Sequence, residues 1–417
     1  MIATLAPPVP ADSVLTLPGA ANVRLGRKAH RSGEFDLIIL GGGCAGLSLA
    51  MRLAALGPRC PRTLVIEQRN KYTNDRTWCF WGDISPRVSH LVRHSWRSIA
   101  VRAAGRDVKV DCGSTPYQMI PGEAFYEEAL QAIALSERIE LAMGEGIVTE
   151  PRKCEDKWRI ETSEGLRSGA VIVDTRPGQG PIPAGAVLWQ SFSGREIECD
   201  SDMFDPTCTE LMDFSARAPT PINFTYVLPM SRRRALIETT VFGPNPMTES
   251  DLANDLKTAV ARQVKYSSFR ILRSENGILP MGLGPGRRGD DATYVNVGLT
   301  AGGARPSTGY AFQRIQRWAD SCARLIGEGK LPAGHENDSV LLKSLDYLFV
   351  SVLRSRPEAA SALFLSFFEK TDAARMIRFM SDRGTIPDFA AIASVLPVFP
   401  FIREIPRAIL RKALLSR

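Results

Sequence analysis

The clearest hydrophobic pattern lies near the start of the chain, in the segment FDLIILGGGCAGLSLAMRLA (35–54). The apolar run at 37–40 predicts a buried strand, the glycines after it predict a tight turn, and the apolar positions of 44–56 predict a helix. A second apolar run, TLVIE at 63–67, predicts another strand. Strand, helix and strand in this order indicate the opening of a parallel βαβ unit.

The rest of the chain changes its pattern several times. Alternating apolar positions in 96–111 predict short strands, 122–135 (GEAFYEEALQAIAL) predicts a helix, and 170–173 predicts a further buried strand. Three segments of 188–242, LWQSFSGREIE, INFTYVLPM and RALIETTVF, are rich in β-branched and aromatic residues and predict antiparallel strands. Residues 294–326 return to strand, small-residue turn and helix, and we expect this strand to lie beside the one at 37–40. Apolar residues at helical spacing predict that the final third is helical.

These elements predict an α/β fold with a Rossmann-type nucleotide-binding domain of the glutathione-reductase kind, a β-rich substrate lobe and a helical C-terminal region. We expect a flexible N-terminus at 1–34 and a discontinuous FAD-binding domain made of 35–180 and 285–330. The β-rich substrate domain would be 181–284, and 331–417 would be a helical cap with a tail that contacts a membrane.

Composition narrows the function classes. Lys and Arg total 52 against 45 Asp and Glu, and the excess is spread along the chain, which argues against a nucleic-acid partner. The eight cysteines form no CxxC pair, and His90 and His94 lack a third ligand, so no metal site is predicted. The first 34 residues lack the apolar core of a secretion signal, which favours a cytoplasmic protein. The longest late uncharged run, 389–402, has 14 residues and two prolines, so it would dip into a membrane and not span it.

The glycines of the first turn have the spacing GxGxxG, at Gly41, Gly43 and Gly46. In dinucleotide-binding domains such glycines permit the tight turn, the close approach of a pyrophosphate and close helix packing. Glu67 ends the next strand 21 residues after Gly46, where an acid accepts hydrogen bonds from the ribose hydroxyls. The pattern therefore predicts an adenine dinucleotide. The interleaved β-rich segment and the late strand, turn and helix favour FAD over NAD.

In FAD proteins of this class, the late turn lies against the flavin. Gly298, Pro306, Thr308 and Gly309 are the candidate cofactor-binding residues of that turn. Flavin hydroxylases and halogenases generally carry a Gly-Asp pair where this chain has Gly298 and Leu299, which argues against oxygen chemistry.

Several motifs together resemble those of bacterial lycopene β-cyclases. In chain order they are DRTWCFW, YQMIPGEAFYEEAL, VIVDTRPG, WQSFSGREIE, LMDF, FTYVLPMSRRRALIETTVF, GILPM and GLTAGGARPSTGYAF. The resemblance spans about residues 35–320 and implies an enzyme that converts the linear ends of lycopene to β-rings, giving γ-carotene and then β-carotene. It implies reduced FAD without net electron transfer, NAD(P)H as electron donor, and lycopene and other acyclic carotenoids as substrates.

The resemblance also places the catalytic acid on Glu238. Ring closure begins with protonation of the terminal double bond, and a carboxyl in a dry, apolar site keeps its proton because burial disfavours the charged form. Strand alternation puts Leu236, Glu238 and Thr240 on one face. The chain departs from the family at Thr239, where an Asp is usual, and at Cys79–Trp81, where a His is common.

Aromatic side chains stabilise cations in apolar sites. The candidates for this role all lie within the motifs above; they are Trp78, Phe80, Trp81, Trp189, Phe224 and Tyr226.

Because the implied substrate dissolves only in membranes, the protein would associate peripherally with the inner (cytoplasmic) membrane. The tail at 398–417 mixes apolar residues with Arg and Lys, a composition typical of an interfacial helix and equally of an ordinary terminal helix. Two other hypotheses fit the same motifs: an FAD-dependent monooxygenase or reductase of an apolar substrate, and a carotenoid-binding flavoprotein without turnover. The sequence predicts no particular oligomeric state.

Overall fold

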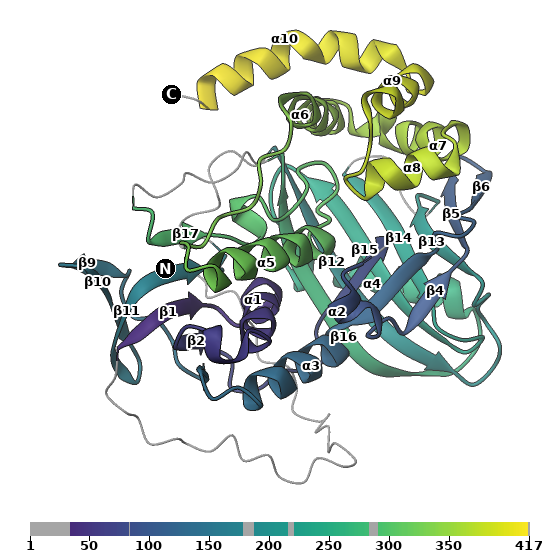
Figure 1. Cartoon of the computed structure of the whole chain (residues 1–417). Coiled ribbons are helices and arrows are strands. Elements are labelled where there is room, and N and C mark those ends of the chain that lie inside the picture. The colour runs from purple at the N-terminus through teal and green to yellow at the C-terminus, as the bar shows by residue number, and fades with distance from the viewer. Residues whose placement is uncertain (1–33, 83, 178–186, 216–220, 283–290, 416–417) are drawn as a thin grey trace. The chain divides into compact units, whose positions relative to one another are not determined.

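The structure is a computed structural model that describes residues 34–82, 84–177, 187–215, 221–282 and 291–415, with the backbone alone for 407–415. The prediction of a flexible N-terminus falls on residues outside this range. The described chain contains a parallel-centred sheet flanked by helices, a large antiparallel-centred sheet, and a series of C-terminal helices (Figure 1).

The first sheet is built around the predicted βαβ unit. Its strand order is β8 (Ile139–Met143), β2 (Thr63–Glu67), β1 (Phe35–Leu40), β11 (Gly165–Asp174), β10 (Lys157–Thr162) and β9 (Arg152–Cys154), with β17 (Tyr294–Asn296) paired to β11. One face packs against α1 (Cys44–Ala54), α3 (Gly122–Ala134) and α5 (Phe312–Gly327). β1 is buried almost throughout because helices and strands cover both of its faces. The Rossmann-type prediction is confirmed.

One detail of that prediction is wrong. The late strand β17 was expected beside β1, but it pairs in parallel with β11, through Ile172 and Tyr294 among others. The hydrogen-bonding positions on both sides of β1 are already taken by β2 and β11. The late segment therefore joins the sheet one strand further out.

The second sheet has the order β16 (Phe269–Met281), β12 (Leu188–Cys199), β15 (Arg234–Gly243), β14 (Ile222–Pro229), β13 (Cys208–Asp213), β5 (Ser98–Ala103) and β6 (Arg106–Asp111). The predicted antiparallel strands of 188–242 form its centre. β5 and β6 come from the 35–180 segment, which we assigned to the FAD-binding domain. They nevertheless belong to the second sheet, because β5 pairs with β13 and β6 pairs with β5. A smaller sheet has the order β3 (Thr77–Trp81), β7 (Tyr117–Pro121) and β4 (His94–Trp96), and the short helix α2 (Pro86–Ser89) lies between β3 and β4 in the chain.

The two faces of the second sheet have different coverings. One face packs on α4 (Glu249–Val264), through Ile197, Val227 and Ile237 on the strands. The other face shares an apolar core with the C-terminal helices α6 (Val340–Ser355), α7 (Ala360–Lys370), α8 (Ala373–Met380) and α9 (Ile386–Val395). The last helix, α10 (Val398–Leu415), packs against α6 (Figure 1). Single turns of 3₁₀ helix lie at Gly57–Arg59, Leu299–Ala301 and Pro357–Ala359.

None of the helices in the described part of the chain has both the length and the hydropathy needed to cross a bilayer. The segments Ile386–Val395 and Val398–Pro406 are long and apolar enough only when taken together, and they meet at a bend of 108°.

Candidate active site

The turn between β1 and α1 contains glycines at positions where a side chain would be strained or would clash, and one glycine beside open space. Gly41 has a φ of +93°, and a Cβ on Gly46 would lie 2.0 Å from the Gly41 carbonyl oxygen. Gly43, the N-cap of α1, has nothing within 4 Å of its Cβ position and no capping side chain. The space beside Gly43 at the N-terminus of α1 is therefore open, and a helix N-terminus with no capping side chain suits a phosphate group.

Glu67 lies at the same turn, as its position in the sequence predicted. Its Oε2 accepts a hydrogen bond from the Gly42 N–H at 2.7 Å, and its Oε1 accepts from the Arg69 backbone N–H at 2.8 Å. The hydroxyl of Tyr72 donates to the Gly42 carbonyl at 2.9 Å. An acid that is buried and held at the glycine turn is in the place from which ribose hydroxyls are bound in dinucleotide-binding domains.

The late glycine turn lies beside the first one, and Thr175 connects the two. The Thr175 hydroxyl donates to the Gly41 carbonyl at 2.9 Å, while a Cβ on Gly298 would lie 3.1 Å from the Thr175 carbonyl oxygen. Gly298 has a φ of +96°, and its N–H donates to Nε2 of His335 at 3.2 Å. Burial lowers the pKa of His335 to about 4, which keeps this imidazole neutral and able to accept.

Beyond Gly298, the chain forms a closed turn that reaches the second sheet. The N–H groups of Thr308 and Gly309 both donate to the Arg305 carbonyl, and the Pro306 carbonyl accepts from Gly282. Gly309 has a φ of +72°, and a Cβ there would lie 3.1 Å from Oε1 of Gln190 on β12. The structure thus brings the predicted residues of both turns together and sets the second turn against the sheet that carries Glu238.

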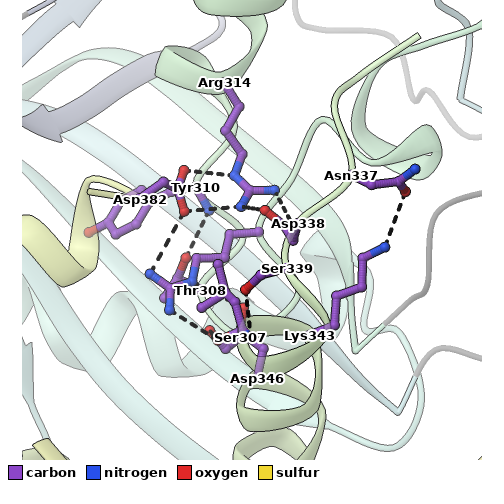
Figure 2. Close-up of polar contacts among 12 residues, drawn as sticks. Ser307, Thr308, Tyr310, Arg314, Asn337, Asp338, Ser339, Lys343, Asp346 and Asp382 are labelled. Carbon is purple, nitrogen blue, oxygen red and sulfur yellow. Dashed lines mark hydrogen bonds and ion pairs between the residues drawn. The ribbon is translucent and has the colours of Figure 1, made fainter. Parts of the chain in front are cut away.

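Buried ion pairs hold this turn to the C-terminal helices. The Arg305 guanidinium donates to both carboxylate oxygens of Asp346 on α6, at 3.1 and 3.0 Å, and Ser307 donates to the same carboxylate at 2.8 Å. Figure 2 shows the second part of the network, in which Arg314 of α5 lies between Asp338 and Asp382. Sequence patterns did not single out Arg305 or Asp346, because these two partners lie 41 positions apart in the chain.

Glu238 lies near the middle of β15, on the face of the sheet that the C-terminal helices cover. Its neighbours Leu236 and Phe242 belong to the apolar core shared with those helices, whereas Ile237 faces α4. The predicted alternation is therefore confirmed, and Glu238 is only 8% exposed. The Thr240 hydroxyl donates to its Oε1 at 2.8 Å.

The surroundings of Glu238 favour its neutral form. Burial is the largest cause, and together with the negative charge of Glu275 it raises the pKa of Glu238 from 4.5 to about 8. The Thr240 hydrogen bond and the positive charge of Arg273 offset part of this effect. A carboxyl group that keeps its proton near neutral pH can act as a general acid.

Polar and aromatic side chains surround the acid. Tyr226 stands directly opposite Glu238 in the β14–β15 ladder, and its hydroxyl lies 2.9 Å from that of Tyr117, which lies 3.2 Å from that of Tyr310. Trp81 packs on Tyr117 with ring centroids 4.3 Å apart. Cys79, Tyr226 and Tyr310 are half-buried, and burial raises the pKa of each.

The structure separates the predicted aromatic candidates into two groups. Trp81, Phe224 and Tyr226 belong to the core on the Glu238 side of the sheet. Trp78 and Phe80 instead stack on Phe312 in the core of the first sheet. Trp189 lies away from the acid as well, because the alternation of β12 turns its side chain to the face opposite Gln190 and Gly194.

Position 239 also points away from the acid. The Thr239 hydroxyl donates to Oδ1 of Asn223 at 3.3 Å, and Asn223 donates in turn to Asp255 of α4. A carboxylate at 239 would therefore lie on the other face of the sheet.

Among the described residues, no group of three or more His, Cys, Asp or Glu side chains is placed to hold a metal ion. Nε2 of His90 lies 3.3 Å from Glu128 at the surface.

Comparison with known proteins assigns the chain to a family. The family described as lycopene cyclase protein matches residues 36–405. The chain belongs to the lycopene cyclase family. Lycopene β-cyclase of Pseudescherichia vulneris is 27% identical over 311 residues, which cover 71% of this chain and 75% of that protein. Lycopene β-cyclase of a Paracoccus species is 28% identical over 306 residues, 70% of this chain and 74% of that protein.

Solved structures support the fold of this lycopene cyclase family member. A geranylgeranyl bacteriochlorophyll reductase-like protein from Thermoplasma acidophilum has a TM-score of 0.55 at 13% identity, over 92% of this chain and 99% of that chain. The flavin-dependent monooxygenase PieE, solved with FAD and substrate, has a TM-score of 0.54 at 12% identity, over 88% of this chain and 73% of that chain. At these identities the similarity concerns the fold.

The raised pKa of Glu238 predicts a pH-dependent effect on stability. Below pH 4.5 the carboxyl is protonated in both the folded and the unfolded chain. As the pH rises toward 8, the unfolded chain releases the proton first, so the free energy of unfolding falls. We expect Glu238→Gln to remove this loss, so that the variant gains on the order of 1–4 kcal/mol over the wild type between pH 5 and pH 8.5.

Urea unfolding of both proteins at the two pH values measures the effect. Glu198→Gln, on the partly exposed side chain of Glu198 in β12, is the control and should show no such pH-dependent gain. A stability difference between Glu238→Gln and wild type that stays constant with pH would contradict the raised pKa.

Proposed function

We propose that the protein is a lycopene β-cyclase that forms β-rings at the linear ends of lycopene, giving γ-carotene and then β-carotene, with reduced FAD and without net redox change. The observation that carries the proposal is Glu238, a buried carboxyl held neutral on an apolar and aromatic sheet face in a chain of the lycopene cyclase family. An alkene has no polar group for hydrogen bonding, so its protonation requires mainly a protonated acid that is shielded from water and held next to the double bond.

Glu238 supplies the proton for ring closure. Because Thr240 donates to Oε1, the proton of the neutral carboxyl is carried by Oε2. Its transfer to the terminal double bond of the substrate produces a tertiary cation, which the next double bond attacks to close the six-membered ring. Loss of a ring proton then gives the β-ring, and the carboxylate of Glu238 is the base that recovers it. Atoms and charge balance, and the acid is restored for the next ring.

Two features protect the cation during this sequence. The apolar core shared by the sheet and α6–α9 excludes water, which would otherwise capture the cation as an alcohol. The rings of Trp81 and Tyr226 on the Glu238 side offer their electron-rich faces, each worth on the order of 1–2 kcal/mol to a desolvated cation.

The residues of the two turns fit a dinucleotide. The open position above Gly43 would take the pyrophosphate, Glu67 the ribose, and the 306–309 turn the flavin ring. A bound reduced flavin would supply negative charge that stabilises the developing cation. Gly309 lies against Gln190 and Glu238 against Gly194, four residues further along β12, or about 13 Å. The second sheet thus connects the turn with the acid.

Two glycine variants separate folding from cofactor binding. Gly46→Ala places a methyl group 2.0 Å from the Gly41 carbonyl, and we expect a loss of about 2 kcal/mol or more in the free energy of unfolding. Gly43→Ala meets no atom within 4 Å, so the apoprotein should keep its stability while its flavin affinity falls at least about tenfold. Urea unfolding and flavin titration measure the two effects. Unchanged flavin affinity in Gly43→Ala would argue against a pyrophosphate at this position.

The proposed reaction is tested by the pigments of a lycopene-accumulating bacterial host. The wild type should yield γ-carotene and β-carotene, and Glu238→Gln should leave lycopene unchanged, with at least about a hundredfold loss of ring formation. Thr239→Ala is the matched control. The side chain of Thr239, next to Glu238 in the chain, lies on the α4 side of the sheet, so this variant should keep activity within about twofold.

Other outcomes would favour the alternative hypotheses. An oxygenated or reduced product with stoichiometric NAD(P)H consumption would identify a monooxygenase or reductase, whereas a folded, flavin-loaded wild type that binds lycopene unchanged would identify a binding protein. Catalytic NAD(P)H use, needed only to keep the flavin reduced, is expected for the cyclase.

We further propose that the protein works in the cytoplasm, bound peripherally to the inner membrane where its substrate is dissolved. The support comes from apolar side chains exposed at and after the α9–α10 corner, which are Val398, Phe399, Ile402 and Ile405, and from Ile386 at the other end of α9. Phe401 differs, because it stacks on Phe349 of α6 and belongs to the packing of the cap. Deleting the whole tail would therefore damage the cap, and point substitutions are the cleaner test.

The double variant Phe399→Ser with Ile402→Ser removes side chains that are 80% and 58% exposed. We expect stability to change little and binding to phosphatidylglycerol-containing vesicles to fall at least about fivefold, since interfacial binding scales with buried apolar area. Leu135→Ser with Tyr266→Ser removes even more exposed residues elsewhere and should bind as the wild type does. Co-sedimentation with vesicles measures both. Equal binding by the two double variants would contradict docking through this corner.

A further inference from the structure

Two glutamates face each other across a glycine in the second sheet. In the ladder formed by β16, β12 and β15, Gly194 is the direct partner of both Glu275 and Glu238. Directly paired residues project to the same face, so both carboxyl groups lie on the side covered by the C-terminal helices. A Cβ on Gly194 would already lie 3.3 Å from the Cβ of Glu238. The position between the two acids is therefore kept free of a side chain.

The two glutamates differ in how their charge is balanced. Glu275 accepts from Arg273 at 2.5 Å and from the Thr77 hydroxyl at 2.7 Å, so its carboxylate is paired with a guanidinium. Arg273 is itself fixed, because it also donates to Glu196 at 2.6 Å. Among the ion pairs of the described residues, this network includes Glu275 and Glu196 but not Glu238.

We propose that Glu275 is a positioning residue for the cyclisation, whose fixed negative charge across Gly194 keeps the proton on Glu238 until an alkene is in place. The inference rests on the proposed function of Glu238 as the acid. Two carboxylates that share a buried site do not both ionise readily, so fixing the charge of one favours the neutral form of the other. Glu275 thus supplies a second acid on the same face as Glu238, whereas the next residue in the sequence, Thr239, faces the other way.

Other titratable groups around Glu238 do not change charge near neutral pH. Cys79 of β3 lies close enough to feel the charges of both glutamates, and burial raises the pKa of its thiol to about 12. Burial also raises the pKa of Tyr226 on β14, Tyr117 on β7 and Tyr310 well above that of a free tyrosine. Arg273 stays positive. Lycopene has no ionisable group, so a change in the alkaline limb caused by a substitution at 275 reports the proton on Glu238.

The test compares Glu275→Gln, Glu275→Asp and the control Glu198→Gln, each as the flavin-loaded full chain with lycopene in vesicles from pH 5.5 to pH 9. Glu275→Gln should move the alkaline limb of the rate profile to lower pH, with a loss on the order of three- to tenfold at pH 8 and less than about twofold at pH 6. Glu275→Asp keeps the charge and should lie nearer the wild type. Glu198→Gln, on a carboxylate that pairs with Arg270 at the sheet edge, should match the wild type.

A second measurement does not depend on turnover. The carbonyl stretching band of the protonated Glu238 carboxyl, identified by its absence in Glu238→Gln, can be titrated by infrared spectroscopy in each variant. The band should disappear at lower pH in Glu275→Gln than in the wild type. Glu275→Ser, a second neutral variant that leaves Arg273 paired with Glu196, should give the same displacement if the Gln variant fails to fold.

The outcomes separate the two proposals. A uniform loss of rate at every pH, with the infrared titration unmoved, would overturn the positioning role while ring formation by the wild type upheld the proposed function. If the wild type forms no rings but the band still moves in the neutral variants, the coupling of the two carboxyls stands and the proposed function fails.

Discussion

Burial of the Glu238 carboxyl is the constraint on which the rest of the site depends. A charged carboxylate in that position would lose its hydration, so the folded protein holds it neutral and the proton is available at neutral pH. Burial requires that the Glu238 face of the second sheet be covered, and this face shares an apolar core with the C-terminal helices. The same covering keeps water from a cation. One arrangement therefore prepares the acid and protects what it produces.

The C-terminal helices also have a second role, which is to fix the late glycine turn. Arg305 and Asp346 are almost completely inaccessible, and an ion pair of that kind is costly to break because the remaining charge stays buried and unpaired. The pair joins the 305–310 turn to α6, while Arg314 joins α5 to the segments around Asp338 and Asp382 (Figure 2). The turn that fits a flavin and the helices that close the acid site are thus held by one network.

The glycines of this protein show how the absence of a side chain can be informative. Gly46 lets α1 approach β1, and Gly194 lets two carboxylates interact across a strand. The first was predictable because its spacing belongs to a local turn. The second had no such signal, although Asn276 alone separates Glu275 from the GILPM motif.

The sequence by itself determined the elements whose cause is local. The apolar run before the glycines predicted β1 and α1 to within two residues, and the alternation of RALIETTVF placed Glu238 on the apolar face of β15. Only the tertiary structure decided which distant strands pair: β17 joined β11, β5 and β6 joined the second sheet, and Trp78, Phe80 and Trp189 lay away from the acid. Periodicity specifies which way a side chain points along its own strand, whereas its neighbours depend on register and packing between segments far apart in the chain. The family resemblance identified Glu238 in the sequence and alternation gave its face, whereas no pattern in the sequence connected it with its partner Glu275.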